Sequence, residues 1–336
     1  MAHPAILVNG VEREGRQVNM ALSNHAISAL LPVKNGEIYL DALLPNILSM
    51  LSPCDELVVI NDGSSDQTKS IIEKFGASDL RVNLINTPGI GLVNALNLGV
   101  ESAQHQWIAR FDVDDQYSKN RLDEERKLLS NEVSVIFSDY QFMSKRGANL
   151  GAIYSAVSPL PTVLSLFSSQ RTAHPSALIN KELLIQCGGY LEQDYPAEDL
   201  ALWLRLSEFG TIISVPKTLL LYRLSGASIS GQSRQAQLRK KDELILNYGL
   251  WSSWQNQCIE FFDETLSRYK SMPNAPERIF FHMRDLHLVA NLVNIKVPYA
   301  KFFAKIGLGM TLRMVGSFVK VSYYTILRRL YRFVSR

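Results

Sequence analysis

The sequence predicts an α/β fold in which helices flank a mostly parallel central sheet. Apolar, strand-like segments alternate with helical segments through the first half of the chain, the order that parallel strands with right-handed crossovers require. The 336 residues are 46% hydrophobic, which is enough for a substantial core. The segment 107–115 is apolar and then ends abruptly in carboxylates. This ending indicates a ligand site at the carboxyl end of a strand.

The expected elements follow from hydrophobic periodicity and from turn and cap residues. Strands are expected at 26–34, 56–60, 81–86, 107–112 and 133–139. Helices are expected at 37–51, 66–75, 92–104, 120–131 and 197–205, the second with Ser65 as its N-cap. A looser Ser/Pro-rich stretch up to Pro161 is the expected position of an insertion that faces the acceptor.

The composition favours a protein of a reducing compartment. Cys54, Cys187 and Cys258 lie far apart, which argues against a disulfide framework or a cysteine-type zinc site. Residues 1–25 are polar and show no secretion signal, so they are interpreted as an N-terminal extension. The expected catalytic domain is 26–230, and a helical C-terminal region, 231–336, follows it.

The net charge of +3 conceals a strong asymmetry. Residues 296–336 contain nine Lys or Arg and no Asp or Glu, and the remaining residues contain 26 basic and 32 acidic side chains, a net charge of −6. In the tail, 297–336, apolar side chains alternate with the cations, a pattern typical of a helix on an anionic membrane surface. The alternative is an amphipathic helix packed on the catalytic domain. The acidic body argues against nucleic acid as a partner.

The carboxylates Asp112, Asp114 and Asp115 form the strongest functional signal. Carboxylates so close together repel one another unless a cation lies between them, and hard oxygen ligands favour Mg²⁺ or Mn²⁺. An EF-hand loop is excluded because Tyr117 stands where that loop needs Gly. A solvated turn or a helix cap remains the alternative for the motif taken alone. The sequence 89–94 lacks the third Gly of a dinucleotide fingerprint.

Three acidic positions are expected to converge at the carboxyl edge of the sheet. Asp62 follows the second strand, Asp112 and Asp114 follow the fourth, and Glu198 and Asp199 begin a helix. Taken singly, the last two are readily explained as residues that complement the helix dipole. Together the three positions predict group transfer from a nucleotide diphosphate: Asp62 accepts hydrogen bonds from a base or ribose, Asp112 and Asp114 hold a metal-diphosphate, and Asp199 takes a proton.

An ordered series of motifs resembles family 2 glycosyltransferases of the GT-A fold. The matching segments are 31–35, 59–66, 91–99, 108–115, 174–176, 188–190, 198–205 and 222–223, within residues 26–230. The resemblance implies a Rossmann-like central sheet flanked by helices.

The resemblance also implies a role for individual residues. Those implied at the nucleotide site are Pro32, Val33, Asn35, Asp62, Asn97, Arg110 and Asp112. Asp112 and Asp114 match the DxD metal motif, with Mn²⁺ or Mg²⁺ as cofactor, and Asp199 matches the catalytic base, with Glu198 beside it at the acceptor. His174 and Arg223 are expected as diphosphate or acceptor contacts, with structural roles as alternatives. Many relatives carry a histidine shortly after the Tyr-Arg pair, where this chain has Ser225.

The function expected from this resemblance is an inverting transfer of a hexosyl or N-acetylhexosaminyl group. The donor is a nucleotide sugar, with a UDP-sugar favoured, and the acceptor is lipid-linked or a polysaccharide of the cell surface, such as O-antigen, capsule or exopolysaccharide. The expected location is peripheral, on the cytoplasmic face of the cell membrane. The alternatives are a sugar-1-phosphate nucleotidyltransferase, for which no Gly-rich triphosphate loop follows the first strand, and a non-catalytic nucleotide-binding membrane scaffold.

Overall fold

The computed structural model describes residues 25–155, 166, 172–224 and 234–247, together with 272, 274, 276, 278 and 279. The predicted N-terminal extension, except for His25, lies outside these residues, as do Ser225 and the basic tail. Within the described residues, no helix is long and apolar enough to cross a membrane.

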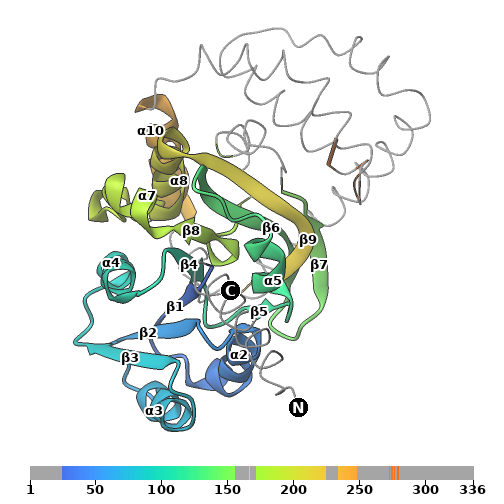
Figure 1. The fold of residues 1–336 in the computed structure, drawn as a ribbon. Coiled ribbons are helices and arrows are strands. Elements are labelled where there is room, and N and C mark those ends of the chain that lie inside the picture. The colour runs from blue at the N-terminus through green and yellow to red at the C-terminus, as the bar shows by residue number, and fades with distance from the viewer. Residues whose placement is uncertain are drawn as a thin grey trace, which may run out of the picture.

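The described strands form one curled sheet (Figure 1). They are β1 (Ile27–Val33), β2 (Glu56–Asp62), β3 (Val82–Thr87), β4 (Trp107–Arg110), β5 (Gln116–Tyr117), β6 (Val133–Met143), β7 (Asn149–Ile153), β8 (Leu178–Asn180) and β9 (Thr211–Arg223). Their order is β3-β2-β1-β4-β8-β6-β9-β5, and β7 pairs with β6. The first four strands in this order are parallel, as are β6 and β9, whereas β8, β5 and β7 pair antiparallel. The predicted α/β fold class is confirmed.

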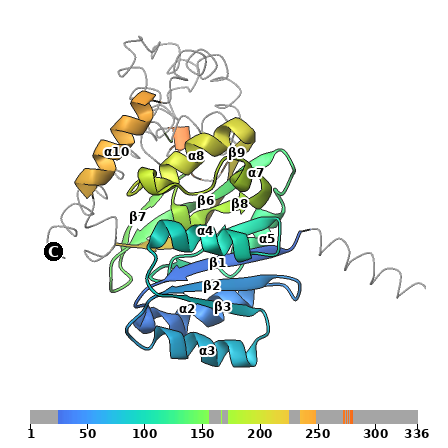
Figure 2. The ribbon, with the colours of Figure 1, turned by 90° about the vertical axis from the view of Figure 1, so that its left-hand side faces the viewer.

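Helices cover both faces of this sheet (Figures 1 and 2). They are α2 (Glu37–Met50), α3 (Thr68–Ser78), α4 (Leu92–Ser102), α5 (Arg121–Arg126), α7 (Lys181–Gln186), α8 (Glu198–Phe209) and α10 (Arg234–Asn247), with single 3₁₀ turns at His174–Ser176 and Glu192–Asp194.

Successive side chains of each buried strand point to opposite faces of the sheet, so the core consists of two clusters, one on each face. In β2, Leu57 and Val59 face a cluster that includes residues of α2, α3 and α5, whereas Val58 and Ile60 face a cluster that includes residues of α4, α7 and α8. Because both faces are covered, β1 and β2 are buried along their whole length. Gly99 permits the close approach of α4, since a Cβ at this position would lie 2.2 Å from Leu30 Cδ1.

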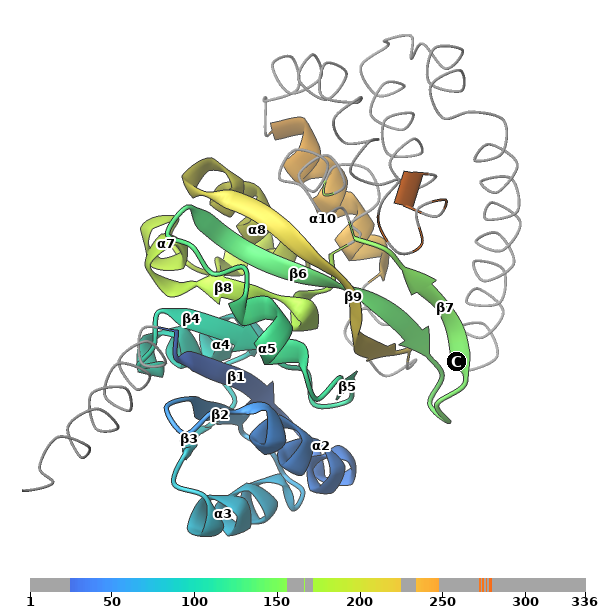
Figure 3. The ribbon, with the colours of Figure 1, turned by 45° about the vertical axis from the view of Figure 1, so that its right-hand side comes forward.

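Three local predictions were wrong. The helix α3 begins at Thr68, because the backbone N–H and hydroxyl of Ser65 bond to Asn35 instead of capping the helix. The helix expected at 120–131 ends at Arg126. The stretch after 139 is not loose as far as 155, because β6 continues to Met143 and returns as β7 through a turn in which Gly147 has φ +83° (Figure 3). The rest of that stretch, 156–161, lies outside the described residues.

The few described residues after 230 contact the body of the fold. Leu244, Met272 and Ile279 pack on the same core cluster as α4 and α8. The Arg278 guanidinium is fully buried and forms a bidentate ion pair with the Asp139 carboxylate of β6. Some residues beyond the predicted boundary at 230 therefore share the core of the catalytic domain. The boundary itself stays a prediction.

Candidate active site

The predicted site residues gather where the parallel strands end. The strands β1, β2, β3 and β4 run in the same direction, so the loops that follow them leave the same edge of the sheet (Figure 1). Asn35 and Asp112 lie in these loops, and Asp62 is the last residue of β2. This is the edge at which open α/β sheets bind ligands.

The acidic loop 112–115 is held by buried aromatic and cationic side chains. The N–H of Asp112 donates to the Tyr117 hydroxyl at 2.6 Å. The Tyr117 ring packs edge-on against Phe111, with centroids 4.6 Å apart, and the Arg121 guanidinium lies over Phe111 at 4.5 Å. Arg121 is fully buried, pairs with Glu125 at 3.0 Å and donates to the Arg110 carbonyl at 2.9 Å. These contacts fix the position of the acidic loop.

Arg110 is directed at this loop. Its Nη2 lies 2.7 Å from Asp112 Oδ1, its Nη1 donates to the Phe111 carbonyl, and only 3% of the side chain is exposed. One oxygen of Asp112 is therefore engaged within the protein. The Arg110 Nε has no hydrogen-bond partner among the described residues.

Negative charge accumulates in the acidic loop. Burial, and then the charge of Asp112, raise the pKa of Asp114 to about 6. Burial raises the pKa of Asp115 well above its usual value, with Asp112 and Asp114 adding to the effect. Asp115 Oδ1 accepts the Arg223 N–H at 2.7 Å, while its Oδ2 is buried with no partner among the described residues. Carboxylates in this condition are stabilised by an added cation.

The donor set fits Mg²⁺ or Mn²⁺ bound together with a diphosphate. No group of three or more His, Cys, Asp or Glu within the described part of the chain is arranged as a complete metal site. Mg²⁺ is usually held by one or two carboxylates plus substrate phosphates and water, and does not need such a cage. Asp112 and Asp114 supply that number of carboxylates.

Glu198 and Asp199 begin α8. Burial, and then the charge of Asp199, raise the pKa of Glu198 to about 7. Burial also raises the pKa of Asp199, and the charge of Asp112 adds to this rise. Glu198 Oε2 has no hydrogen-bond partner within the described residues.

The same charges act on the acidic loop and on the start of α8. Arg110 lowers, and Asp112 raises, the pKa of both Glu198 and Asp199. The structure therefore brings the two acidic segments together although they are far apart in the sequence. Helix capping does not require the carboxylates of α8 to lie near Asp112, so capping alone does not explain this arrangement.

The predicted nucleoside residues lie at the ends of β1 and β2 and in the loop after β1. Pro32 and Val33 are buried at the end of β1, and Asn35 adopts a left-handed backbone with φ +54°. Asn35 Oδ1 accepts the Ser65 N–H at 2.8 Å, which joins the loops after β1 and β2. Burial tends to raise the pKa of Asp62, but hydrogen bonds from Thr87, Ile90 and Gly91 outweigh it and lower the pKa.

Asn97, His174 and Arg223 make contacts within the protein. The Asn97 amide donates to the Tyr190 carbonyl at 2.8 Å and accepts the Tyr190 N–H at 3.0 Å, which ties α4 to the loop before α8. His174 Nε2 lies 2.9 Å from the Tyr190 hydroxyl. Burial, and then Arg110, hold the pKa of His174 well below its usual value, so the ring is neutral.

Arg223 positions the acidic loop through the backbone. Its Nε donates to the Asp114 carbonyl at 2.6 Å, and its Nη1 donates to the Lys145 carbonyl at 2.7 Å. The Arg223 side chain thus joins the acidic loop to the β6–β7 turn. A role for Arg223 and His174 at the diphosphate or acceptor stays a prediction.

Sequence reasoning missed several residues of the site. The Tyr117 hydroxyl accepts the Asp112 N–H, and Arg121 donates to the Arg110 carbonyl just before the acidic loop. Tyr190 lies among Arg110, Glu198 and Asp199. Their contacts are long-range or involve the backbone, so no short motif marks them. The spacing Asp112-x₄-Tyr117-x₃-Arg121 is visible only once the loop is known to fold back on itself.

Comparison with known proteins shows which family the first half of the chain resembles. Residues 28–151 match the model for glycosyl transferase family 2. The chain is 27% identical over 219 residues to an uncharacterized glycosyltransferase of Haemophilus influenzae, covering 61% of this chain and 67% of that protein. It is 25% identical over 213 residues to the "Putative teichuronic acid biosynthesis glycosyltransferase TuaG" of Bacillus subtilis, covering 62% of this chain and 83% of that protein.

Solved structures match the fold. The crystal structure of S. aureus TarS 1–349 in complex with UDP has a TM-score of 0.54 and 19% identity, covering 78% of this chain and 80% of that chain. The complex of the same TarS fragment with UDP-GlcNAc gives 0.55 and 16%, covering 80% and 92%. At these identities the likeness concerns the fold, which is GT-A.

Proposed function

We propose, from the premise that this chain belongs to glycosyltransferase family 2, that it transfers a sugar from a nucleotide sugar to a surface-polysaccharide acceptor with inversion of configuration. The observation that carries the proposal is that the acidic loop and the start of α8 lie close enough for the charge of Asp112 to raise the pKa of Asp199. A nucleotide-binding scaffold has no need of a buried carboxylate beside its diphosphate site.

Asp199 is the proposed general base. A sugar hydroxyl is a poor nucleophile at neutral pH, so a carboxylate must accept its proton as the bond to the anomeric carbon forms. The raised pKa of Asp199 makes it a stronger base than an exposed aspartate. One base and one departing diphosphate imply direct displacement, which inverts the anomeric carbon without a covalent intermediate.

The departing nucleoside diphosphate is assigned to the edge between Asp62 and Asp114. Asp112 and Asp114 would hold Mg²⁺ or Mn²⁺, which neutralises negative charge on the leaving group when it is bound. Arg110 adds a fixed positive charge beside Asp112. A UDP-sugar is the favoured donor, consistent with the UDP and UDP-GlcNAc complexes of the TarS fold neighbour.

The proposed acceptor is lipid-linked or a polysaccharide, and the proposed location is the cytoplasmic face of the membrane. The TuaG relative is named for teichuronic acid biosynthesis, and a further relative, 28% identical over 115 residues, carries the name "Putative glycosyltransferase EpsH". The basic tail, 297–336, has the charge pattern of a membrane-binding segment.

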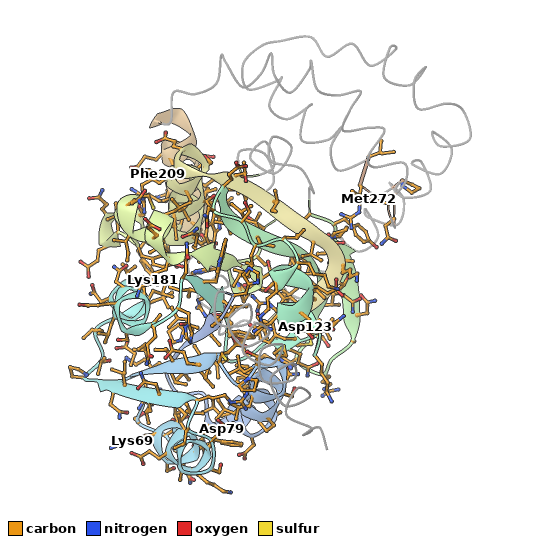
Figure 4. The ribbon with its side chains drawn as sticks, viewed as in Figure 1. Lys69, Asp79, Asp123, Lys181, Phe209 and Met272 are labelled. Atoms are coloured by element: carbon orange, nitrogen blue, oxygen red, sulfur yellow. The ribbon has the colours of Figure 1, made fainter. Side chains whose placement is uncertain are left out.

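The test is release of nucleoside diphosphate from UDP-, GDP- and dTDP-sugars by the purified full chain. Membrane extract supplies the acceptor, and Mg²⁺, Mn²⁺ or EDTA sets the metal. We expect metal-dependent release from one donor and a loss of at least about 100-fold in Asp199→Asn, with nucleotide affinity retained. Asp123→Asn is the matched control, because Asp123 lies exposed on α5 and pairs only with Arg126 among the described contacts (Figure 4).

The outcomes separate an enzyme from a scaffold. Equal release by Asp199→Asn and the unsubstituted chain would overturn the assignment of the base. Nucleotide binding with no release from any donor, in the presence of membrane extract from a polysaccharide-producing cell, would favour the scaffold. A retained α-configuration in the product of an α-linked donor would contradict inversion.

A further inference from the structure

An exposed aromatic side chain lies just before the proposed base. Tyr195 is 44% exposed and comes directly before the segment that begins α8 with Glu198 and Asp199. Among the described residues, the one other exposed aromatic side chain is Phe209, at the opposite end of the same helix. A single exposed ring needs no functional explanation by itself, so the position of Tyr195 decides what it can do.

The backbone around Tyr195 is held by the body of the fold. The buried Asp194 carboxylate accepts a hydrogen bond from Arg205 Nη1 of α8 at 2.6 Å. The Tyr195 N–H donates to the Glu192 carbonyl at 3.1 Å. The Ala197 N–H donates to the Asp194 carbonyl at 2.8 Å. This backbone is ordered before a ligand arrives, so binding at Tyr195 costs little conformational entropy.

The same loop reaches the nucleotide side of the site. Asn94 Nδ2, on α4, donates to Glu192 Oε1 at 2.6 Å. The helix α4 begins directly after Gly91, whose N–H donates to the Asp62 carboxylate at 3.0 Å. The segment that carries Tyr195 therefore connects the start of α4, beside the nucleotide residues, with the start of α8, beside the base.

Tyr195 is also within reach of the reacting hydroxyl. Four peptide units join Tyr195 to Asp199, so their Cα atoms are at most about 14 Å apart. An acceptor whose hydroxyl lies at Asp199 has its neighbouring atoms within this distance. Between the two residues, Glu198 Oε2 is buried and has no hydrogen-bond partner within the described part of the chain.

A sugar ring offers the two kinds of surface that these side chains can bind. Its C–H groups form an apolar face with a slight positive charge, which is attracted to the negative face of an aromatic ring. Its hydroxyl groups, at the edge of the ring, donate to a carboxylate oxygen. The Tyr195 ring suits the apolar face, and Glu198 Oε2 suits a hydroxyl.

We propose that Tyr195 is a stacking platform for a sugar ring of the acceptor and that it holds this ring while a hydroxyl of the acceptor meets Asp199. The proposal rests on the proposed function, because it takes Asp199 as the base. It implies that the acceptor presents a sugar ring at this position, not a lipid chain or a bare phosphate. Tyr195 is a specificity-determining residue in this account and takes no part in the displacement.

The test is saturation of the full chain with acceptor, measured as nucleoside diphosphate release against a dilution series of membrane extract. Tyr195→Ala is expected to need about tenfold more extract for half-maximal release, whereas calorimetric affinity for the nucleoside diphosphate with Mg²⁺ stays unchanged. Tyr195→Phe keeps the ring, so its half-saturating amount is expected to stay within about twofold.

Phe209→Ala is the matched control, because Phe209 is also 44% exposed and lies at the far end of α8 (Figure 4). The helix has 12 residues and is about 18 Å long, which places Phe209 away from the base. Tyr195→Leu separates stacking from simple apolar contact. Leucine is apolar but has no flat ring, so this variant is expected to behave like Tyr195→Ala.

Each other outcome overturns the proposal. Unchanged saturation in Tyr195→Ala would mean that the acceptor does not contact this ring. Full retention by Tyr195→Leu would indicate an apolar contact, such as a lipid chain, and an equal loss of nucleotide affinity would place Tyr195 at the donor or in the stability of the fold. In these cases release that is sensitive to Asp199→Asn would leave the proposed function standing. Absence of extract-dependent release by the unsubstituted chain would overturn both proposals.

Discussion

Glu198 and Asp199 are adjacent carboxyls that share one electrostatic environment. The pKa of Glu198 is raised to about 7, and that of Asp199 is also raised. Two coupled acids titrate as a pair, and the pair holds a proton near neutral pH more readily than exposed carboxyls do. A base must be ionised to accept a proton, so kcat/KM is expected to fall as the pH is lowered through about 7.

The substitution Glu198→Gln tests this origin of the pH profile. Removal of the neighbouring negative charge lowers the pKa of Asp199, so the acid limb of kcat/KM is expected to shift to lower pH by about one unit. The control is Glu73→Gln, which changes an exposed carboxylate on α3. An acid limb that stays in place in Glu198→Gln would show that the pair does not titrate in catalysis.

At the residue scale, the sequence predicts which residues form the site better than it predicts which groups those residues contact. Asp62, Asp112 and Asp199 could be found because acidic residues at two strand ends and at one helix start have few purely structural explanations as a set. The engagement of Asn97 with the Tyr190 backbone and of Arg223 with the Asp114 carbonyl could not be predicted. Such contacts depend on where two distant backbones meet, which a local pattern does not encode.

At the scale of elements, the contact between α4 and β1 depends on one glycine. A Cβ at Gly99 would lie 2.2 Å from Leu30 Cδ1 and 3.1 Å from Leu30 Cδ2 in the buried core. Gly99→Ala is therefore expected to lower the free energy of unfolding by about 1–3 kcal/mol through overpacking, although alanine favours the helix itself. The measurement is urea unfolding followed by circular dichroism.

A double-mutant cycle identifies Leu30 as the cause. Leu30→Ala removes the atoms that an alanine at 99 would meet, so the two substitutions together are expected to cost less than the sum of their single effects. Gly76→Ala on α3 is the matched control, because a Cβ there meets nothing closer than 3.8 Å. Strict additivity at 30 and 99 would contradict the steric explanation.

The parallel strands β1 to β4 and the first part of β6 could be predicted from the sequence, and the other strands could not. The strands β1, β2 and β4 are buried on both faces, so their runs of apolar residues are long and clear. The short strands β5 and β8 contain two and three residues, too few for a periodic signal. The hairpin β6–β7 was missed because its turn, around Gly147, follows a mixture of polar and aromatic residues.

At the scale of the whole molecule, one buried ion pair joins the far end of the described chain to the sheet. Arg278 and Asp139 are both buried, and Arg278 Nη1 also donates to the Ser155 carbonyl at 2.8 Å. Arg278→Met leaves the Asp139 charge buried without its cation, so it is expected to lower the free energy of unfolding by about 3–5 kcal/mol. Chemical unfolding of the full chain measures this loss.

The double variant Arg278→Met with Asp139→Leu separates the cost of a buried charge without its cation from the contribution of the ion pair itself. Replacing both charges with apolar groups removes the buried carboxylate together with the cation, so part of the stability lost in Arg278→Met is expected to return. Lys240→Met, which breaks an exposed pair with Glu243 on α10, is the control and should change stability by less than about 1 kcal/mol. An Arg278→Met chain as stable as the unsubstituted one would show that residues after 230 do not secure the domain.

The distribution of charge along the whole chain predicts how it meets a membrane. The tail, 297–336, lies outside the described residues, but its sequence carries basic side chains and no acidic ones, whereas residues 1–295 have a net charge of −6. Each Lys or Arg near an anionic surface contributes about 1 kcal/mol, and salt screens this attraction. Binding of the full chain to vesicles that contain anionic lipid is therefore expected to exceed binding to zwitterionic vesicles by at least about tenfold and to weaken with added salt.

Deletion of 297–336 is expected to abolish this preference for anionic vesicles in a flotation assay. The control is deletion of 1–24, a terminal segment in which two glutamates balance two arginines. Because the tail is proposed to act at the membrane and the acidic loop on the donor, we expect the deleted chain to bind nucleotide diphosphate with the affinity of the full chain. Unchanged vesicle binding after the deletion would mean that the cations of the tail do not meet the membrane and that another surface brings the site to its acceptor.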